Sequence, residues 1–288
     1  MSTTTTTLPP APAGAAGPAP SKAAAPREGR IGLRANLRHI GALARRNLLQ
    51  IKKDPESMFD VLLMPVIFTL LFVYVFGGSV GSSLGGDRHD YVNYLIPGLM
   101  AMMGMNIAMA VGTGVNDDFR KGVMDRFRTM PIARSSVLIA KIVVELGRMM
   151  VAILILLAMG FALGMTLETS VLGLLAAVAL SAVFGAAIMW IFILLGLSMK
   201  TAQAVQGMGM LVLMPLQFGS SIFAPTQTMP GWLQAFTDYN PLSNLADAVR
   251  GLMVGGPVAS SVWGTLAWAA GITLVTAPLA VSKFRKKT

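Results

Sequence analysis

The chain lacks the residues on which several common chemistries depend. It has no cysteine, so disulfides and thiolate metal sites are excluded. Its two histidines, His39 and His89, lie in different segments and do not form a metal cluster in sequence. The dipeptide Gly-Lys never occurs, so the phosphate cradle G-x-x-x-x-G-K-[ST] is absent, and no H-E-x-x-H or Ser/His/Asp pattern is recognisable. We therefore expect no catalytic site, metal or bound cofactor on this chain, and any ATP-driven work requires another polypeptide.

Charge is also scarce. Charged residues make up 12% of the 288 residues, hydrophobic residues make up 54%, and the mean hydropathy is +0.65. Soluble domains carry about a quarter charged residues, so this deficit indicates a lipid environment. Since ~20 apolar residues suffice to cross a bilayer as a helix, and period-two alternation is missing, the sequence predicts an all-α integral membrane protein. The six predicted spans are 58–76, 94–115, 137–164, 171–197, 204–223 and 262–281.

The positions of the basic residues predict the orientation. With both termini in the cytoplasm, all Lys and Arg except Arg88 and Arg250 lie on or near the cytoplasmic side, which is a strong positive-inside bias. The net charge of +10 is then explained by topology and by contact with anionic lipid, and nucleic-acid binding is disfavoured. The first thirty residues have no apolar core and do not resemble a signal peptide. We expect a multi-pass protein of the cytoplasmic membrane.

The region before the first span falls into two parts. Residues 1–30 are rich in Thr, Ala and Pro and are predicted to form a disordered cytoplasmic tail, whereas 31–288 form the transmembrane domain. Apolar residues recur every three or four positions over 33–53, with basic residues between them. This pattern predicts a cytoplasmic amphipathic helix at the membrane interface. Its basic residues include Arg38, Arg45 and Arg46.

The predicted outer stretch 224–261 is too polar for another span. Pro241 and Ser243 can start a helix in which Leu245, Val249 and Leu252 share one face. We interpret the stretch as a pair of short helices half-inserted into the outer leaflet. An ordinary extracellular loop helix is the alternative.

The predicted inner loop 116–136 carries charges of both signs. Asn116 can cap a helix there, with Phe119, Val123 and Phe127 on an apolar stripe, and Pro131 ends it. Mixed charge beside apolar side chains is typical of a selective protein–protein contact, whereas a helix that only touches lipid would be more uniformly basic. A simple connection between two spans is the alternative.

Two groups of residues within the predicted spans are unusual. Lys141, Glu145 and Arg148 are spaced to neutralise one another, and we interpret them as structural charges, with a proton or substrate role as the less favoured alternative. Methionines and amides also gather in the second and fifth spans. Methionine is flexible and polarisable, which suits a surface for varied apolar ligands, although adaptable helix packing gives the same pattern. The predicted substrate pathway or dimer interface consists of Met102, Met105, Asn106, Met109, Gln206, Met210, Met214 and Gln217.

The segment DDFRKGVMDRFRTMPIARSSVLIAK resembles the loop between the second and third spans of ABC-2 type permeases, in the antibiotic-resistance branch typified by the daunorubicin/doxorubicin exporters. The matching residues are Gly122, Asp125, Arg126, Phe127, Arg128 and Pro131. The segment NPLSNLADAVRGL, residues 240–252, is similar to the Asn-Pro…Arg-Gly signature before the last span of that family. Many members have a Glu-Arg-Glu triad where this chain has Asp118, Phe119 and Arg120.

The resemblance implies a homodimer that works with two copies of a separate nucleotide-binding subunit, on which ATP and Mg²⁺ are bound. It implies that this ATPase touches the amphipathic helix at Arg38, Arg45 and Arg46. The inner contact would be a coupling helix that includes Asp118, Phe119, Arg120, Gly122, Val123, Asp125, Arg126, Phe127, Arg128 and Pro131. The expected function is export of an amphipathic or hydrophobic small molecule such as an antibiotic. A lipid-linked glycan permease, a secondary transporter and a non-transporting scaffold are the alternatives.

Overall fold

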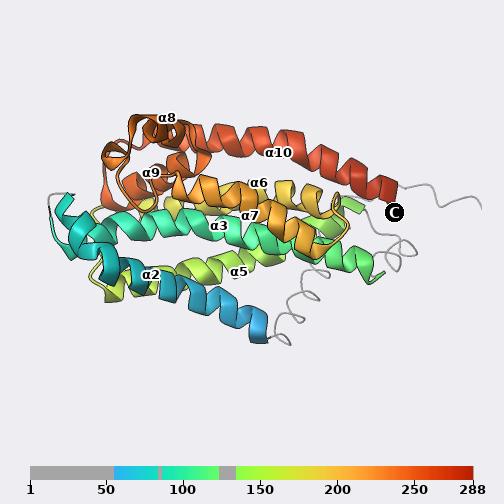
Figure 1. Ribbon diagram of the computed structural model, residues 1–288, viewed down its shortest axis with the longest axis horizontal. Coiled ribbons are helices and arrows are strands. Elements are labelled where there is room, and N and C mark those ends of the chain that lie inside the picture. The colour runs from blue at the N-terminus through green and yellow to red at the C-terminus, as the bar shows by residue number, and fades with distance from the viewer. Residues whose placement is uncertain (1–54, 84–85, 123–133, 288) are drawn as a thin grey trace, which may run out of the picture.

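The described part of the chain is built from helices. The computed structural model describes residues 55–83, 86–122 and 134–287 (Figure 1). Within these ranges no residue is in a strand. The helices are α2 (Pro55–Ser83), α3 (Arg88–Arg120), α5 (Arg134–Ala162), α6 (Val171–Gly196), α7 (Ala202–Phe218), the short 3-10 helix η1 (Thr226–Thr228), α8 (Gly231–Tyr239), α9 (Pro241–Val254) and α10 (Ala259–Lys287).

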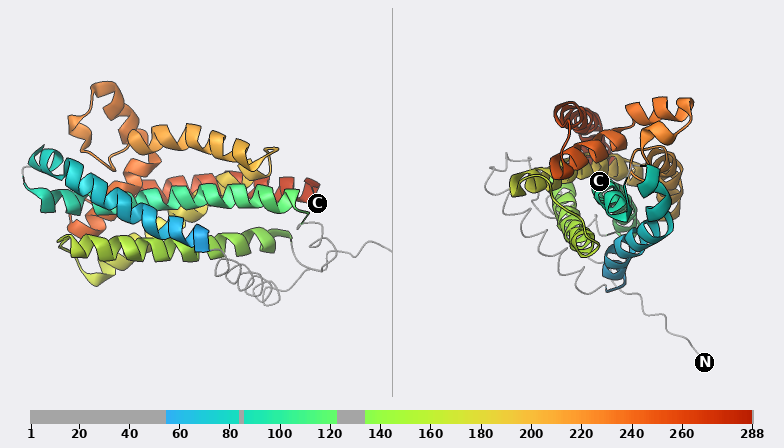
Figure 2. Two further views of the ribbon diagram at one scale, coloured as in Figure 1. Left: turned by 60° about the horizontal axis from the view of Figure 1, so that its bottom comes forward. Right: turned by 90° about the vertical axis from the view of Figure 1, so that its left-hand side faces the viewer.

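Helix α3 is the central element of the bundle. It begins with a capping box: the Asp87 carboxylate accepts from the backbone amide of His89, and the Asp90 carboxylate accepts from the backbone amide of Asp87. Most of its side chains from Tyr91 to Asn116 are buried. Helices α2, α5, α6, α7 and α9 all pack against it, and Figures 1 and 2 show it enclosed by its neighbours.

The closest helix contact joins α3 to α6. A Cβ atom added to Gly196 would lie 2.3 Å from the carbonyl oxygen of Gly112, and one added to Gly104 would lie 3.2 Å from the Cα of Gly185. Small residues allow two backbones to approach in this way, and van der Waals contact between helices is the main source of association in lipid. We call Gly104, Gly112, Gly185 and Gly196 the glycine seam.

The bundle has two ends of different character (Figure 1). The end that carries α8 and α9 also holds the start of α3, and we call it the α9 end. The opposite end holds the last turn of α3, the turn between α6 and α7, and the C-terminal turn of α10. We call it the basic end because it carries Arg120, Lys121, Lys200, Lys283, Arg285, Lys286 and Lys287.

Five helices of the described part are long and apolar enough to cross a membrane: α2, α3, α5, α6 and α10. The predicted fifth span, 204–223, corresponds to α7, which has only 17 residues, followed by the non-helical segment 219–223. The prediction of an all-helical membrane protein is therefore confirmed, whereas the count of six spans is not. Helices η1, α8 and α9 do occupy the outer stretch 224–261, although their depth in a membrane stays a prediction.

The helices extend beyond the predicted spans. Helix α2 continues to Ser83 and α3 begins at Arg88, so most of the stretch between the predicted spans 58–76 and 94–115 is helical. At its other end α3 runs on to Arg120, so Asn116 lies inside a helix and does not cap a new one. A hydropathy pattern could not reveal either extension. It ends a span where polar residues begin, but the helix continues through Arg88 at one end and through the acidic pair at 117–118 at the other.

Several predictions fall outside the described residues. They are the tail 1–30, the amphipathic helix 33–53 with Arg38, Arg45 and Arg46, and, in the inner loop, Val123, Asp125, Arg126, Phe127, Arg128 and Pro131. These stay predictions.

Candidate transport surface and its anchors

At the basic end, Asn116 ties α3 to the turn between α6 and α7. Its side chain is buried, and Nδ2 donates to the carbonyl of Gly196 at 2.9 Å and to that of Met199 at 2.8 Å. These carbonyls lie at the C-terminal end of α6, where a helix leaves backbone acceptors unsatisfied. The amide therefore closes the end of α6 against α3, beside Gly112 and Gly196 of the glycine seam.

The charges predicted within the third span have one partner more than the sequence indicated. Arg148 binds Glu145 at 3.1 Å on the same helix, as the spacing predicts, and Glu145 is only 8% exposed. Lys141 binds Asp118 of α3 at 2.5 Å and also lies close enough to Glu145 to attract its carboxylate. The three predicted residues therefore lie together, and Asp118 is a further partner that the spacing did not indicate. The Asp118–Lys141 ion pair connects the last turn of α3 with the first turns of α5, so it bridges the two ends of the predicted inner loop.

Phe119 also has a partner inside the chain. Its ring meets that of Phe284 edge-on at 5.5 Å between centroids, and the Lys287 ammonium lies 5.8 Å from its centroid. Phe284 is buried in the last turn of α10. Arg120 is exposed, and Gly122 leaves the helix at a φ of 65°, a value that L side chains rarely adopt. Contact with an ATPase stays a prediction for these residues.

The predicted methionine and amide residues divide into two groups. Met102 and Met105 are buried in the core of the chain, so they do not line a surface in this structure. The other predicted residues lie on α3 and α7. On α7, Met210 and Met214 are 49% and 51% exposed, and Gln206 is exposed one turn earlier.

A direct contact joins the two helices of this second group. Gln217 of α7 donates Nε2 to Oδ1 of Asn106 on α3 at 3.4 Å. Gly209 leaves room for Met109, whose sulfur would lie 3.2 Å from an added Cβ. We call Asn106, Met109, Gln206, Met210, Met214 and Gln217 the amide–methionine surface. Helix α7 lies on the outside of the bundle, on the side from which α8 projects (Figure 2).

At the α9 end, Asn240 links three elements. Its Oδ1 accepts from the Leu242 amide at 2.9 Å and caps α9, while its Nδ2 donates to the carbonyls of Leu216 at 2.8 Å and Gly219 at 2.9 Å. The side chain thus starts one helix and closes the end of α7, which stops at Gly219. This arrangement gives the asparagine of the outer signature a physical role.

The segment 219–223 is irregular backbone, and its residues 219–222 are buried. Its carbonyls are bound by side chains from α3 and α8: the hydroxyl of Tyr94 donates to Ser221 O at 2.6 Å, that of Tyr91 to Phe223 O at 3.3 Å, and that of Thr237 to Gly219 O at 3.1 Å. Non-helical backbone at membrane depth is tolerated only when it is satisfied in this way. We call 219–223 the buried linker.

The sequence interpretation missed the tyrosines and Thr237 because each is an ordinary residue of a helix. Gly219, which follows Pro215 and precedes Ser220 and Ser221, is the signal that could have indicated the end of a helix and a buried turn needing polar partners. Arg250, the arginine of the Asn-Pro…Arg-Gly signature, also binds this linker.

Comparison with known proteins gives the family. The sequence profile of the ABC-2 type transporter family matches residues 38–254. The chain is 36% identical over 242 residues to the daunorubicin resistance ABC transporter permease protein DrrB1 of Streptomyces coeruleorubidus, covering 84% of each chain. It is 28% identical over 248 residues to the probable doxorubicin resistance ABC transporter permease protein DrrC of Mycobacterium tuberculosis, covering 84% of this chain and 87% of the relative.

A more distant relative is the probable multidrug ABC transporter permease YbhR of Escherichia coli, 26% identical over 69% of this chain and 54% of the relative. The family match includes the helices from α2 to α9, the outer signature and the inner segment, in agreement with the resemblance of both motifs. The chain belongs to the ABC-2 type transporter family.

Proposed function

We propose that this chain is the permease subunit of an ATP-driven exporter of amphipathic or hydrophobic small molecules, including drugs of the kind named for its relatives, daunorubicin and doxorubicin. The observation that carries the proposal is the 36% identity, over 84% of both chains, to a permease named for daunorubicin resistance. The five helices able to cross a membrane fit a permease.

The orientation that we propose places the basic end in the cytoplasm. The exposed side chains of Arg120, Lys121 and Lys200 support it, because cytoplasmic ends of membrane proteins are enriched in Lys and Arg. The sixth crossing would be made by α7 together with the buried linker, since the linker's polar backbone is bound by protein groups and does not require water.

The amide–methionine surface is the proposed contact for substrate. It combines flexible, polarisable thioethers with three amides, which suits ligands that are largely apolar and carry a few hydrogen-bonding groups. Met210, Met214 and Gln206 are exposed in the single chain, so a second copy facing them could enclose a path. We therefore propose a homodimer with substrate passing between its two halves.

The energy would come from two copies of a separate ATPase subunit, which would hold ATP and Mg²⁺. Their contact would be at the basic end, at the loop between α3 and α5. The Asp118–Lys141 ion pair and the Phe119–Phe284 contact support this, because they connect the base of that loop to α5 and to α10. Movement of the loop would thus reach three helices.

The test is transport by the complete complex. Inside-out vesicles that contain the chain and its ATPase should accumulate doxorubicin when ATP is added, and vanadate should stop accumulation while a protonophore should not. Met210→Ala combined with Met214→Ala should weaken uptake about tenfold, because two exposed thioethers leave the binding surface. Leu274→Ala is the matched control, since Leu274 is an exposed apolar residue of α10. Uptake that needs a proton gradient instead of ATP would overturn the proposal.

A further inference from the structure

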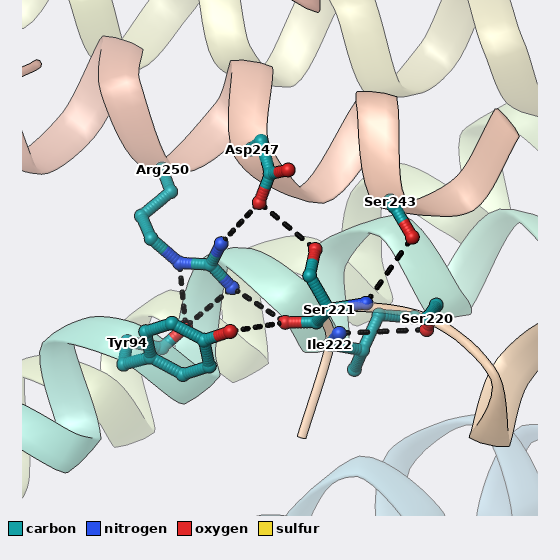
Figure 3. A network of polar contacts seen from close by, with 7 residues as sticks. All are labelled: Tyr94, Ser220, Ser221, Ile222, Ser243, Asp247 and Arg250. Atoms are coloured by element: carbon teal, nitrogen blue, oxygen red, sulfur yellow. Dashed lines mark hydrogen bonds and ion pairs between the residues drawn. The ribbon is translucent and has the colours of Figure 1, made fainter. Parts of the chain in front are cut away.

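Arg250 of α9 is bound more extensively than any surface arginine requires. Its side chain is 17% exposed, and Nη1 donates to Oδ1 of Asp247 at 2.6 Å. Nε and Nη2 donate to the carbonyl of Tyr94 at 3.3 and 3.2 Å, and Nη2 also donates to the carbonyl of Ser221 at 3.0 Å (Figure 3). The guanidinium carbon lies 3.7 Å from the centroid of the Tyr94 ring. One side chain therefore joins α9, α3 and the buried linker.

Ser221 is the residue on which these contacts converge. Its carbonyl accepts from Arg250 and from the Tyr94 hydroxyl, its Oγ donates to Asp247 at 2.8 Å, and its amide donates to Oγ of Ser243 at 3.2 Å (Figure 3). All three polar groups of one linker residue are thus held by α3 or α9. Bonds that involve a charged group are about twice as strong as neutral ones, so the arginine and the aspartate contribute most of this restraint.

The linker in turn determines where α7 ends. Ser221 lies three residues beyond Phe218, the last residue of α7, and Gln217 lies in the final turn of that helix. Gln217 contacts Asn106, so the last turn of α7 carries the contact that closes the amide–methionine surface at this end. A displacement of Ser221 would move this turn relative to α3.

Arg88 provides the comparison within the same end of the molecule. Among the described residues, Arg88 and Arg250 are the two arginines of the α9 end. Arg88 is exposed, and its guanidinium lies 5.1 Å from the Tyr74 ring. It contacts neither the linker nor α9 in any bond described above. The two arginines carry equal charge at the same end, but only Arg250 is connected to α7 through the buried linker.

We propose that Arg250, Asp247 and Tyr94 are positioning residues for transport: they hold the buried linker against α3 and so fix the last turn of α7, and with it the side of the amide–methionine surface that meets substrate. The inference rests on the proposed function of that surface, but the position of α7 can be measured without any transported drug.

The absence of cysteine from the chain makes this measurement direct. Asn106→Cys and Gln217→Cys introduce one thiol on α3 and one on α7 at side chains that are in contact. The full chain, assembled with its ATPase in proteoliposomes, is treated with a short thiol cross-linker. In this background Arg250→Gln should slow cross-linking about tenfold, since it removes hydrogen bonds from a charged donor. Asp247→Asn should slow it less, and Arg88→Gln should leave the rate unchanged.

A second readout separates positioning from simple stability. Without the two cysteines, Arg250→Gln should raise the doxorubicin concentration for half-maximal uptake about tenfold, with ATP hydrolysis in the absence of drug unchanged. Arg250→Lys should recover part of the loss, because it keeps a cation for Asp247. If the role of Arg250 were purely structural, the variant would lower the amount of folded complex and the maximal rate of uptake. The doxorubicin concentration for half-maximal uptake and the cross-linking rate of the folded fraction would then stay unchanged.

The outcomes are distinct. Unchanged cross-linking in folded Arg250→Gln and Asp247→Asn overturns the inference, even if doxorubicin is transported. Slower cross-linking confirms it, and if doxorubicin is then not transported by the natural chain, only the proposed substrate is wrong. If Arg250→Gln does not fold, Tyr94→Phe provides the same test, because it removes only the hydroxyl bound to Ser221. Its cross-linking should slow about threefold, and an unchanged rate overturns the inference.

Discussion

The two ends of the bundle are held together by different combinations of contacts. At the α9 end, side chains of α3, α8 and α9 bind the backbone of the buried linker, through groups such as Asn240 Nδ2 and Tyr94 Oη. At the basic end, the buried Asn116 amide also binds backbone carbonyls, but the helices additionally meet directly at Gly112 and Gly196, and the Asp118–Lys141 ion pair is partly exposed.

This difference has a physical consequence. A buried carbonyl that loses its donor costs about 1–3 kcal/mol, whereas an exposed ion pair contributes ~0–1 kcal/mol. We therefore expect the α9 end to be rigid. We expect the basic end to combine sensitive contacts at the glycine seam and at Asn116 with an ion pair that can break at little cost in free energy. An end that receives movement from a partner benefits from contacts of the second kind.

The largest effect should come from the glycine seam. Gly196→Ala places a methyl group 2.3 Å from the Gly112 carbonyl oxygen, which is backbone and cannot rotate away. The free energy of unfolding should fall by about 3 kcal/mol, the upper range for overpacking. Thermal unfolding of the purified protein in detergent, followed by size-exclusion chromatography, measures the loss.

Gly271→Ala in α10 is the matched control for this change. No atom lies within 4 Å of an added Cβ at that helical position, so the variant should be unchanged or up to about 1 kcal/mol more stable, because alanine favours a helix over glycine. If Gly196→Ala is as stable as Gly271→Ala, the packing of α3 on α6 does not depend on close backbone contact. The glycine seam would then not distinguish the basic end from the α9 end.

The next effect tests the α9 end. Asn240→Ala removes the cap of α9 and the donors to Leu216 and Gly219, so we expect a loss of about 2 kcal/mol in thermal unfolding experiments. Asn240→Ser restores a capping oxygen but cannot replace both donors. It should recover about 1 kcal/mol. Full recovery by serine would mean that capping alone matters and that the linker carbonyls do not need the amide.

Much of this arrangement could be predicted from sequence, because the signals were local. The helical nature of the apolar segments, the pairing of Glu145 with Arg148, and a helix beginning near Pro241 all follow from composition or from spacing along one helix. The resemblance of two motifs to ABC-2 permeases is also confirmed by the family match.

The missed features depend on residues that are distant in sequence. Asp118 and Lys141 are 23 residues apart, and Tyr94 and Ser221 are 127 apart, so no spacing rule on one helix could pair them. Met102 and Met105 were predicted on a surface because methionine suits both a binding face and a core, and only the packing of α3 distinguishes the two. The short α7 was missed because the apolar pattern continues through Phe218 into Ile222 and Phe223 after the helix has ended.

The smallest effect should be that of the Asp118–Lys141 ion pair. Its side chains are 36% and 17% exposed, so solvent screens the attraction and the pair should add less than about 1 kcal/mol to stability. Asp118→Asn, Lys141→Gln and the double variant form a cycle in which the interaction energy is the part of the double effect that the single effects do not explain. Thermal unfolding at low and high salt provides the values.

The salt dependence of this coupling energy shows whether Asp118 and Lys141 form a weak, screened ion pair, as expected for the basic end. Screening should bring the coupling energy near zero at ~1 M salt, where the Debye length is about 3 Å. The loss caused by Asn240→Ala should not change with salt, because the hydrogen bonds of the Asn240 amide are neutral. A coupling energy above about 2 kcal/mol, or one that salt does not reduce, would show that Asp118 and Lys141 are a rigid anchor. The two ends would then be held equally firmly, and the loop between α3 and α5 would need another explanation for its ability to move.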